Sequence, residues 1–215
     1  MPVKKKSVFR EYAEAAVIAV ILALFIRTFV VQAFKIPSGS MKPTLLIGDH
    51  ILVNKFTYGV RIPLIDRYVI RLKKPKTGDV VVFKWPKDEE KDFIKRVIGI
   101  EGDKIEIKKD VLFINDEKIK TEYVERYEDE KIPLAYKHLE FLGDCKHYIL
   151  DVDVKRENFG PVIVPENSIF VMGDNRDQSL DSRYWRFVAI NKIKGKAMII
   201  YWSWAHWGRF LNVIR

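Results

Sequence analysis

Three short segments carry residues whose types and spacing are suited to chemistry. The first, IPSGSMKPTL, places two serines around Gly39, and glycine permits backbone angles at which Ser40 is exposed at a tight bend with its amide hydrogen turned outward. Pro37 and Pro43 stiffen the flanks and lower the entropic cost of fixing this geometry. The segment predicts an exposed serine nucleophile; the alternative for this composition is a linker.

The second segment, DFIKRVIGIEGD, contains a lysine within a strand-like run. Alternation along a strand places Phe93, Lys95 and Val97 on one face and Ile94 and Arg96 on the other. Burial in apolar surroundings lowers the pKa of a lysine by up to about 3 to 5 units, which leaves a neutral amine able to accept a serine proton. The segment predicts a general base, and the alternative is a solvated surface lysine.

The third segment, MGDNRDQSLDSRYW, has a high density of hydrogen-bonding side chains. Such a loop is either a well-solvated turn or a platform that orients other groups. Its polar residues are Asp174, Asn175, Arg176, Asp177, Ser179, Asp181, Ser182 and Arg183.

The N-terminal segment is basic and then apolar. Residues 12–34 reach the length of about 20 residues needed to cross a bilayer, provided that Arg27 snorkels toward a headgroup layer or pairs within the protein. The lysines and arginine that precede this stretch favour a cytoplasmic N-terminus. We therefore expect a cytoplasmic tail (1–11), a transmembrane signal-anchor helix (12–34) and an extracytoplasmic domain (35–215). The alternative is a cleaved secretory signal, which the small residues of Val31–Ala33 also fit.

The rest of the chain reads as mainly β. Short runs rich in valine, isoleucine and aromatic residues, such as DVVVFKW and SIFVMGD, are separated by turn residues and predict an antiparallel β-sheet domain. Residues 104–165 are more charged and less patterned, which predicts an inserted β-rich subdomain. The aromatic stretch YWSWAHWGRF (201–210) fits either the bilayer interface or a strand that buries its rings in the core.

Composition narrows the classes of function. The net charge is +9, but acids and bases interleave beyond the first ten residues, so we expect no nucleic-acid partner. Cys145 is the only cysteine, which excludes an internal disulfide and a thiolate metal cluster. We expect no metal and no organic cofactor.

Together, these segments resemble the type I signal peptidases of bacteria, which are membrane-anchored serine proteases that remove signal peptides from exported proteins. The resemblance rests on SGSMKPT, GDHILVNKF, GDVVVFKWP, FIKRVIGIEGD and GDNRDQSLDSRYW, in the family's order. It implies that Ser40 is the nucleophile and Lys95 its general base. It also implies that Ser38 helps the Ser40 amide to stabilise the oxyanion and that Ser179 orients the lysine.

The resemblance extends to supporting and substrate-binding positions. It implies that acidic and basic residues support the site, namely Asp174 with Arg96 and Asp181 with Arg183. It further implies a shallow apolar pocket for a small residue before the cut, lined by Ile36, Met41, Phe93 and Ile94, and a companion pocket lined by Phe34, Ile51 and Val82. The chain departs from the family at Glu101, where proline is common, and at Arg186 and Ala189, where glycine and proline are common.

The implied function is a Ser-Lys endopeptidase of the cytoplasmic membrane that cuts exported preproteins after small residues. We expect a monomer whose partners are preproteins and membrane lipid. The alternative is a membrane-tethered, non-catalytic module that binds extended peptides, which would not require Ser40, Lys95 and Ser179 together. A further alternative is another serine-lysine protease, such as a relative of the self-cleaving repressors. The N-terminal anchor argues against it, because a cytosolic regulator needs no membrane anchor. A histidine-based hydrolase is less favoured, because the histidines (His50, His138, His147 and His206) lie outside the three segments. A cysteine nucleophile at Cys145 is also less favoured, because its surroundings, GDCKH, contain no recognisable set of partner residues.

Overall fold

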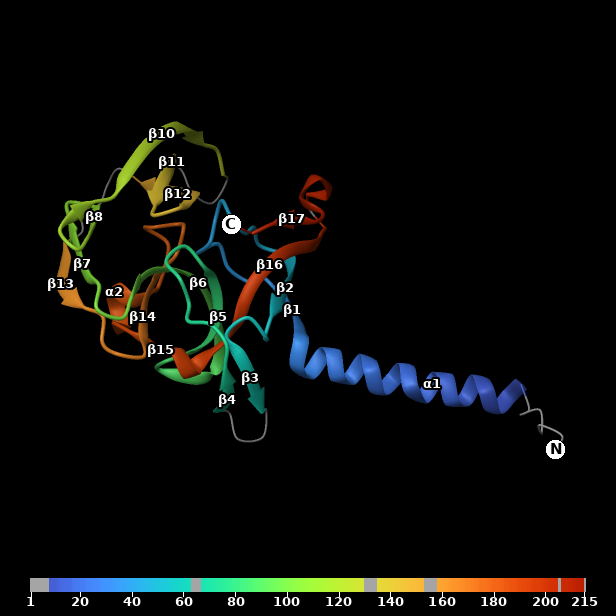
Figure 1. Cartoon of the computed structure of the whole chain (residues 1–215). Helices are drawn as coiled ribbons and strands as arrows, with labels where there is room; N and C mark the ends of the chain where they lie inside the picture. Colours follow the sequence, from blue (N-terminus) through green and yellow to red (C-terminus); the bar gives the residue numbers. More distant parts are fainter. Residues whose placement is uncertain (1–7, 63–66, 130–134, 153–157, 205, 215) are drawn as a thin grey trace.

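The computed structural model describes residues 8–62, 67–129, 135–152, 158–204 and 206–214 of the chain. It is a mainly β structure of antiparallel sheets preceded by an apolar helix (Figure 1). The mainly β prediction is confirmed, and each run that was predicted from valine, isoleucine and aromatic content lies in or overlaps a strand.

The largest sheet has eight strands and positions all three chemistry-bearing segments. Seven follow the order β1-β2-β16-β5-β6-β14-β15, and β17 pairs with β16. Their bounds are β1 (Val31–Lys35), β2 (Asp49–Asn54), β5 (Val80–Trp85), β6 (Asp88–Ile100), β14 (Ser168–Met172), β15 (Val188–Ala189), β16 (Ile193–Ser203) and β17 (Asn212–Val213).

Apolar residues on both faces of this sheet form separate core clusters. Along β5, Val80 and Val82 pack into one cluster, whereas Val81 and Phe83 pack into another. Side chains alternate between the two faces of a strand, so the successive apolar residues of β5 are buried on both faces of the sheet.

The chain leaves the large sheet after β6 and returns to it at β14, the neighbour of β6. Between them, β7 (Lys104–Lys108), β8 (Val111–Ile114), β9 (Glu117–Lys118) and β13 (Phe159–Ile163) form a four-stranded sheet, in the order β13-β7-β8-β9. A three-stranded sheet contains β10 (Lys120–Tyr127), β11 (Ala135–Leu142) and β12 (Cys145–Val152). The predicted insertion, residues 104–165, covers the strands between β6 and β14. Its status as a separate subdomain stays a prediction.

Smaller elements complete the fold. A hairpin of β3 (Gly59–Ile62) and β4 (Arg67–Arg71) lies apart from the large sheet. The short helices are α2 (Ser182–Trp185) and the 3-10 turns η2 (Ile190–Lys192) and η3 (Trp207–Arg209).

The N-terminal helix projects away from the sheets (Figure 1). It comprises α1 (Val8–Phe25) and the π-helical turn η1 (Ile26–Val30), which together form a 23-residue span of mean hydropathy 2.2 with no buried residue. By length and composition this helix is able to cross a membrane. The expected helix boundary at 34 differs from the structure, because residues 31–34 belong to β1 and pair with β2, with Phe34 opposite Ile51.

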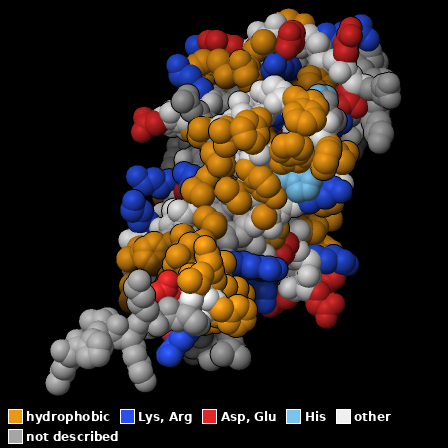
Figure 2. Space-filling view, turned by 90° about the vertical axis from the view of Figure 1, so that its right-hand side faces the viewer, with side chains coloured by type: hydrophobic (Ala, Val, Ile, Leu, Met, Phe, Trp, Pro, Cys, Tyr) orange, Lys and Arg blue, Asp and Glu red, His pale blue; other side chains and the backbone are white. Residues whose placement is uncertain are grey.

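The aromatic C-terminal stretch is only partly buried. Strand β16 ends at Ser203, and beyond it Trp204 and Trp207 are 68% and 67% exposed. Figure 2 shows the side of the molecule from which α1 emerges, where hydrophobic side chains gather at the surface. The stretch therefore does not bury all of its rings in the core.

Candidate active site

The residues predicted as nucleophile and base are brought together by the large sheet. Ser40 lies in the connection between β1 and β2, and Lys95 lies on β6. The Nζ of Lys95 is 2.6 Å from the Oγ of Ser40. Both residues are almost buried, with 3% of Lys95 and 9% of Ser40 exposed. A hydroxyl and an amine at this distance have the geometry that proton transfer requires.

The surroundings of Lys95 favour its neutral form. Burial lowers the pKa of Lys95 from 10.5 to about 8, against the opposing attraction of the carboxylates of Asp181 and Asp174. The Nζ lies 5.6 Å from the ring centroid of Phe93, and Val97 packs in the same core cluster as that ring. The predicted alternation of β6 is therefore confirmed, and it gives the amine an apolar environment.

The loop that carries Ser40 is fixed by the third segment. The backbone N–H of Asn175 donates to the Ser40 carbonyl at 3.1 Å, and its side-chain Nδ2 donates to the Gly39 carbonyl at 3.1 Å. A Cβ at Gly173 would lie 2.4 Å from the Ser40 carbonyl oxygen, so no side chain fits there. From the sequence this loop was either a well-solvated turn or a hydrogen-bonding platform, and nothing in the sequence foretold that Asn175 and Gly173 meet Ser40.

Gly39 has a different role from the one that its sequence context indicated. Its φ is outside the left-handed region that favours glycine. The nearest neighbour of Gly39 is the Lys42 side chain, whose Cε would lie 3.3 Å from a Cβ at Gly39, so a larger residue there would displace this side chain by a few tenths of an ångström. The tight turn continues with a hydrogen bond from the Lys42 N–H to the Gly39 carbonyl at 3.1 Å.

The two further serines occupy different positions around this pair. The Oγ of Ser38 is 3.5 Å from the Oγ of Ser40. Ser179 is buried, and its Oγ has no hydrogen-bond partner among the residues that the structure describes. It would lie 2.3 Å from a Cβ at Gly173, which places its hydroxyl beside the glycine that contacts the Ser40 carbonyl. Its orienting role toward Lys95 stays a prediction.

Arg96 and Asp174 form a buried ion pair next to the site. The guanidinium donates to both carboxylate oxygens, at 2.8 and 2.7 Å, and the two side chains are 0% and 1% exposed. The same carboxylate accepts a hydrogen bond from the hydroxyl of Thr44 at 2.5 Å. Despite its burial, the pKa of the Asp174 carboxyl is lowered by the charge and hydrogen bonds of Arg96. This pair links β6 to the loop after β14.

Asp181 and Arg183 are also placed together, at the start of α2. Asp181 is the N-cap of this helix and accepts hydrogen bonds from the Arg183 backbone N–H and from its guanidinium at 2.9 Å. The Asp181 carboxylate also accepts from the N–H of Gly173 at 3.1 Å. The capping interaction thus holds the backbone next to the Ser40 loop.

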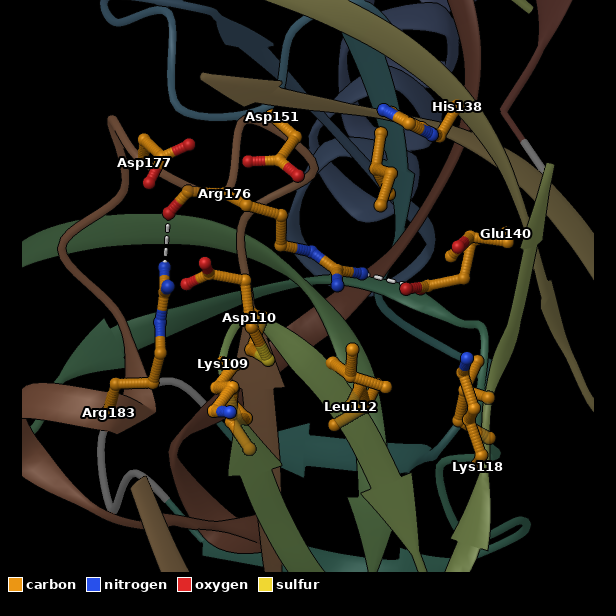
Figure 3. Close-up of a pocket in the computed structure, with 16 residues that line it drawn as sticks. Lys109, Asp110, Leu112, Lys118, His138, Glu140, Asp151, Arg176, Asp177 and Arg183 are labelled. Atoms are coloured by element: carbon orange, nitrogen blue, oxygen red, sulfur yellow. Dashed lines mark hydrogen bonds and ion pairs between the residues drawn. The ribbon is translucent and has the colours of Figure 1, made fainter. Parts of the chain in front are cut away.

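A further buried polar network lies behind Asp174. The Nε2 of His147 is 3.1 Å from Glu140 Oε2 and 3.8 Å from Asp174 Oδ1. Arg176 donates to Glu140 at 2.5 Å, and Figure 3 shows this contact across a cavity of about 410 Å³. His147 lies outside the three segments that the sequence singled out, and nothing in its sequence neighbourhood signals the ion pairs that it approaches.

The predicted substrate-binding residues fall into two core clusters. All but one lie in or against one core cluster, whereas Phe93 packs in the neighbouring cluster. Four of them are buried, and Phe34 and Ile94 are half-buried; the members of the first cluster are Phe34, Ile36, Met41, Ile51, Val82 and Ile94. In the part of the chain that the structure describes, no group of three or more His, Cys, Asp or Glu side chains is arranged to hold a metal ion.

Comparison with known proteins shows the family of this chain. A family model described as "Signal peptidase, peptidase S26" matches residues 9–202. Signal peptidase I of Pseudomonas fluorescens is 41% identical over 213 residues, which cover 93% of this chain and 75% of the relative. Signal peptidase I of Pseudomonas aeruginosa (strain PAO1) is 38% identical over 214 residues, covering 93% and 75%. Signal peptidase I of Aquifex aeolicus is 38% identical over 218 residues, covering 86% and 80%. The chain therefore belongs to the signal peptidase family, peptidase S26.

Proposed function

We propose that this protein is a signal peptidase I, a serine endopeptidase that removes N-terminal signal peptides from exported preproteins with a Ser-Lys dyad. The observation that carries the proposal is the distance of 2.6 Å between Lys95 Nζ and Ser40 Oγ in a buried setting. Membership of the signal peptidase family supports the same reaction.

The reaction follows the chemistry of the two side chains. Neutral Lys95 accepts the hydroxyl proton while the Ser40 oxygen attacks the scissile carbonyl carbon. As the tetrahedral intermediate collapses, the ammonium returns the proton to the leaving amine, and the signal peptide remains as an ester on Ser40. Lys95 then takes a proton from water, which attacks the ester, and returns it to Ser40 when the acid is released.

The developing oxyanion requires hydrogen-bond donors in a fixed position. We assign this role to the Ser40 backbone N–H and to the Ser38 hydroxyl, whose oxygen is 3.5 Å from that of Ser40. One such donor contributes about 10² to 10³-fold to kcat. The hydrogen bonds from Asn175 support this assignment, because they hold the carbonyls of Gly39 and Ser40, on both sides of the Ser40 N–H.

Specificity for small residues follows from the apolar wall beside Ser40. Ile36 and Met41 are 2% and 0% exposed, so they form the floor of a shallow pocket, and the half-buried Ile94 of the same cluster supplies a side. Phe93 lies on the opposite face of β6 and packs in the neighbouring cluster, so it is not part of this wall. Phe34 and Ile51, which are paired between β1 and β2, line the companion pocket with Val82. A shallow pocket admits a small side chain and rejects a bulky one by steric overlap.

The anchor places this site close to a membrane. Helix α1 and η1 continue directly into β1, which precedes Ser40 by a few residues (Figure 1). Lys4, Lys5, Lys6 and Arg10 precede or begin the helix, and basic residues on this side favour a cytoplasmic N-terminus. The β domain then lies on the extracytoplasmic side, where exported preproteins emerge.

The test is cleavage of a preprotein with alanine before its cleavage site by wild-type protein, Ser40→Ala and Lys95→Met. We expect both variants to lose about 10² to 10⁴-fold or more of kcat/KM. Ser168→Ala, which removes a hydroxyl at the start of β14, is the control and is expected to retain wild-type turnover. Turnover retained by Ser40→Ala or Lys95→Met contradicts the assigned roles. A wild-type protein that binds the preprotein without cutting it supports the peptide-binding module instead.

A further inference from the structure

A largely buried ion pair joins the turn of Ser40 to the three-stranded sheet. Lys42, two residues after Ser40, directs its ammonium to the carboxylate of Asp129, which follows β10. The two side chains are only 9% and 16% exposed. This distinguishes the pair from a more exposed ion pair between β10 and β11, Lys137 with Glu125, in which the Glu125 side chain is 58% exposed.

The Lys42 side chain also touches the turn itself. Its methylene chain covers Gly39, to the extent that a Cβ there would be 3.3, 3.5 and 3.8 Å from three of the Lys42 carbons. Its backbone N–H donates to the Gly39 carbonyl. The position of the Lys42 ammonium is therefore coupled to the shape of the turn that encloses Ser40.

The same three-stranded sheet holds the other loop of the site. The N–H of Leu150, on β12, donates to the Asp174 carbonyl at 2.8 Å, and the N–H of Arg176 donates to the Leu150 carbonyl at 2.9 Å. Glu140, on β11, accepts a hydrogen bond from Arg176 (Figure 3). Between these contacts, Asn175 bonds the carbonyls of Gly39 and Ser40.

These contacts form a closed path around the catalytic pair. The chain after β10 reaches the Ser40 turn through Asp129, while Leu150 on β12 and Glu140 on β11 reach the loop that supports this turn. Removing one partner of a buried ion pair leaves an uncompensated charge that draws water or moves. At Lys42, such a movement would shift the turn over Gly39 and expose Lys95.

We propose that Asp129 is a positioning residue, which acts through Lys42 to hold the Ser40 turn against Lys95 and gives the three-stranded sheet a role in the reaction. The proposal rests on the proposed Ser-Lys mechanism. It predicts that the pair controls both the rate of cleavage and the hydration of the amine. A pair that merely stabilises the fold would alter neither the rate of the folded enzyme nor its pH profile.

The test uses the full chain in detergent, with Asp129→Asn and, as a second variant, Lys42→Met. Each is compared with wild type by thermal unfolding and by kcat/KM for preprotein cleavage from pH 6 to 10, at a temperature where all variants are folded. We expect kcat/KM at pH 7 to fall by about 10- to 100-fold, because a small misplacement of the nucleophile is costly. We also expect the acid limb to move to higher pH, because water that reaches Lys95 restores its ordinary basicity.

Asp129→Glu keeps the carboxylate and leaves the Lys42 side chain over Gly39 intact, and it is expected to retain most of the rate and a limb near its wild-type position. Glu125→Gln, which removes an exposed ion pair of β10, is the control and should match wild type. The proposal is overturned if Asp129→Asn and Lys42→Met keep the wild-type rate and limb, or if Asp129→Glu loses as much of both as Asp129→Asn does. Ser40→Ala is measured in parallel. Turnover in Ser40→Ala contradicts the Ser-Lys mechanism. If Ser40→Ala is inactive and Asp129→Asn is unaffected, only the inference about Asp129 is contradicted.

Discussion

The Nζ of Lys95 lies 2.6 Å from the Oγ of Ser40, although 55 positions separate the two residues in the chain. The contact depends on strand β6 crossing the middle of the large sheet and on the β1–β2 connection folding back over it. Lys95 is directed toward Ser40 from a face that is otherwise apolar, with Phe93 beside the amine. The amine of Lys95 is therefore shielded from solvent next to the Ser40 hydroxyl from which it would accept a proton.

The first prediction concerns the pH dependence of cleavage. Burial lowers the pKa of Lys95 from 10.5 to about 8, so the amine is protonated below pH 8 and neutral above it. Because only the neutral amine accepts the serine proton, kcat/KM should rise through about pH 8 and fall about tenfold for each pH unit below it. The measurement is kcat/KM for a preprotein from pH 5 to 10. A profile that is flat through this range, or whose only limb is near 10.5, contradicts the prediction.

A second prediction concerns Gly173, where a Cβ would meet the Ser40 carbonyl at 2.4 Å and the Ser179 hydroxyl at 2.3 Å. Gly173→Ala must displace the Ser40 backbone, so we expect kcat/KM to fall by about 100-fold. We also expect a loss of about 1 to 3 kcal/mol in the free energy of unfolding, because the site is overpacked. Gly208→Ala is the matched control, since nothing lies within 4 Å of its added Cβ. Equal activity of the two variants would show that the close approach at Gly173 is unimportant.

A third prediction concerns Arg186, which ends α2 with a φ of 77°. A side chain in this region is strained by on the order of 1 to 3 kcal/mol, and glycine relieves the strain. Replacement also removes the contact of the guanidinium with the Phe159 ring, at 5.6 Å, so Arg186→Ala and Arg186→Gly must be compared with each other. We expect Arg186→Gly to be more stable than Arg186→Ala by about 1 kcal/mol in chemical denaturation.

The neighbouring residue Ala189 provides the control for that comparison. Its φ of −68° lies in the range that any residue adopts, so Ala189→Gly should lower the free energy of unfolding by about 0.5 to 1 kcal/mol. If glycine is worse than alanine at both positions, the backbone at Arg186 is not strained.

A fourth prediction concerns the exposed rings near the C-terminus. Trp204 and Trp207 are exposed and follow β16, which lies on the same side of the molecule as α1 (Figure 1), and rings of this kind favour the membrane–water interface. A protein that begins at Val31 keeps β1 and lacks the anchor, and we expect it to bind anionic vesicles with a blue shift of tryptophan emission. Trp204→Ser with Trp207→Ser should weaken this binding by roughly tenfold or more, because each buried ring contributes apolar transfer energy.

Tyr184→Ser is the control for this surface, because Tyr184 is an exposed aromatic residue of α2, in another part of the fold. It should bind vesicles as the unmodified domain does. Emission that does not change when vesicles are added to the unmodified domain removes the membrane role of these tryptophans.

The sequence by itself determined the local features of this protein. The alternation of Phe93, Lys95 and Val97 identified a strand with an inward-facing lysine, because the side-chain period of a strand is a local property. Hydropathy likewise located the apolar helix, although not its end, since the transition to a strand at Val31 depends on pairing with β2. The resemblance of short motifs supplied Ser40 as the partner of Lys95.

Only the tertiary structure decided which distant groups meet. Asn175 bonds Gly39 across 136 positions, and Lys42 pairs with Asp129 across 87. Neither contact can be predicted from periodicity or composition. Each depends on the order of the strands and on the way that the inserted sheets pack against the large one. The same holds for Gly39, whose backbone angles do not call for glycine and whose closest contact is the side chain of Lys42.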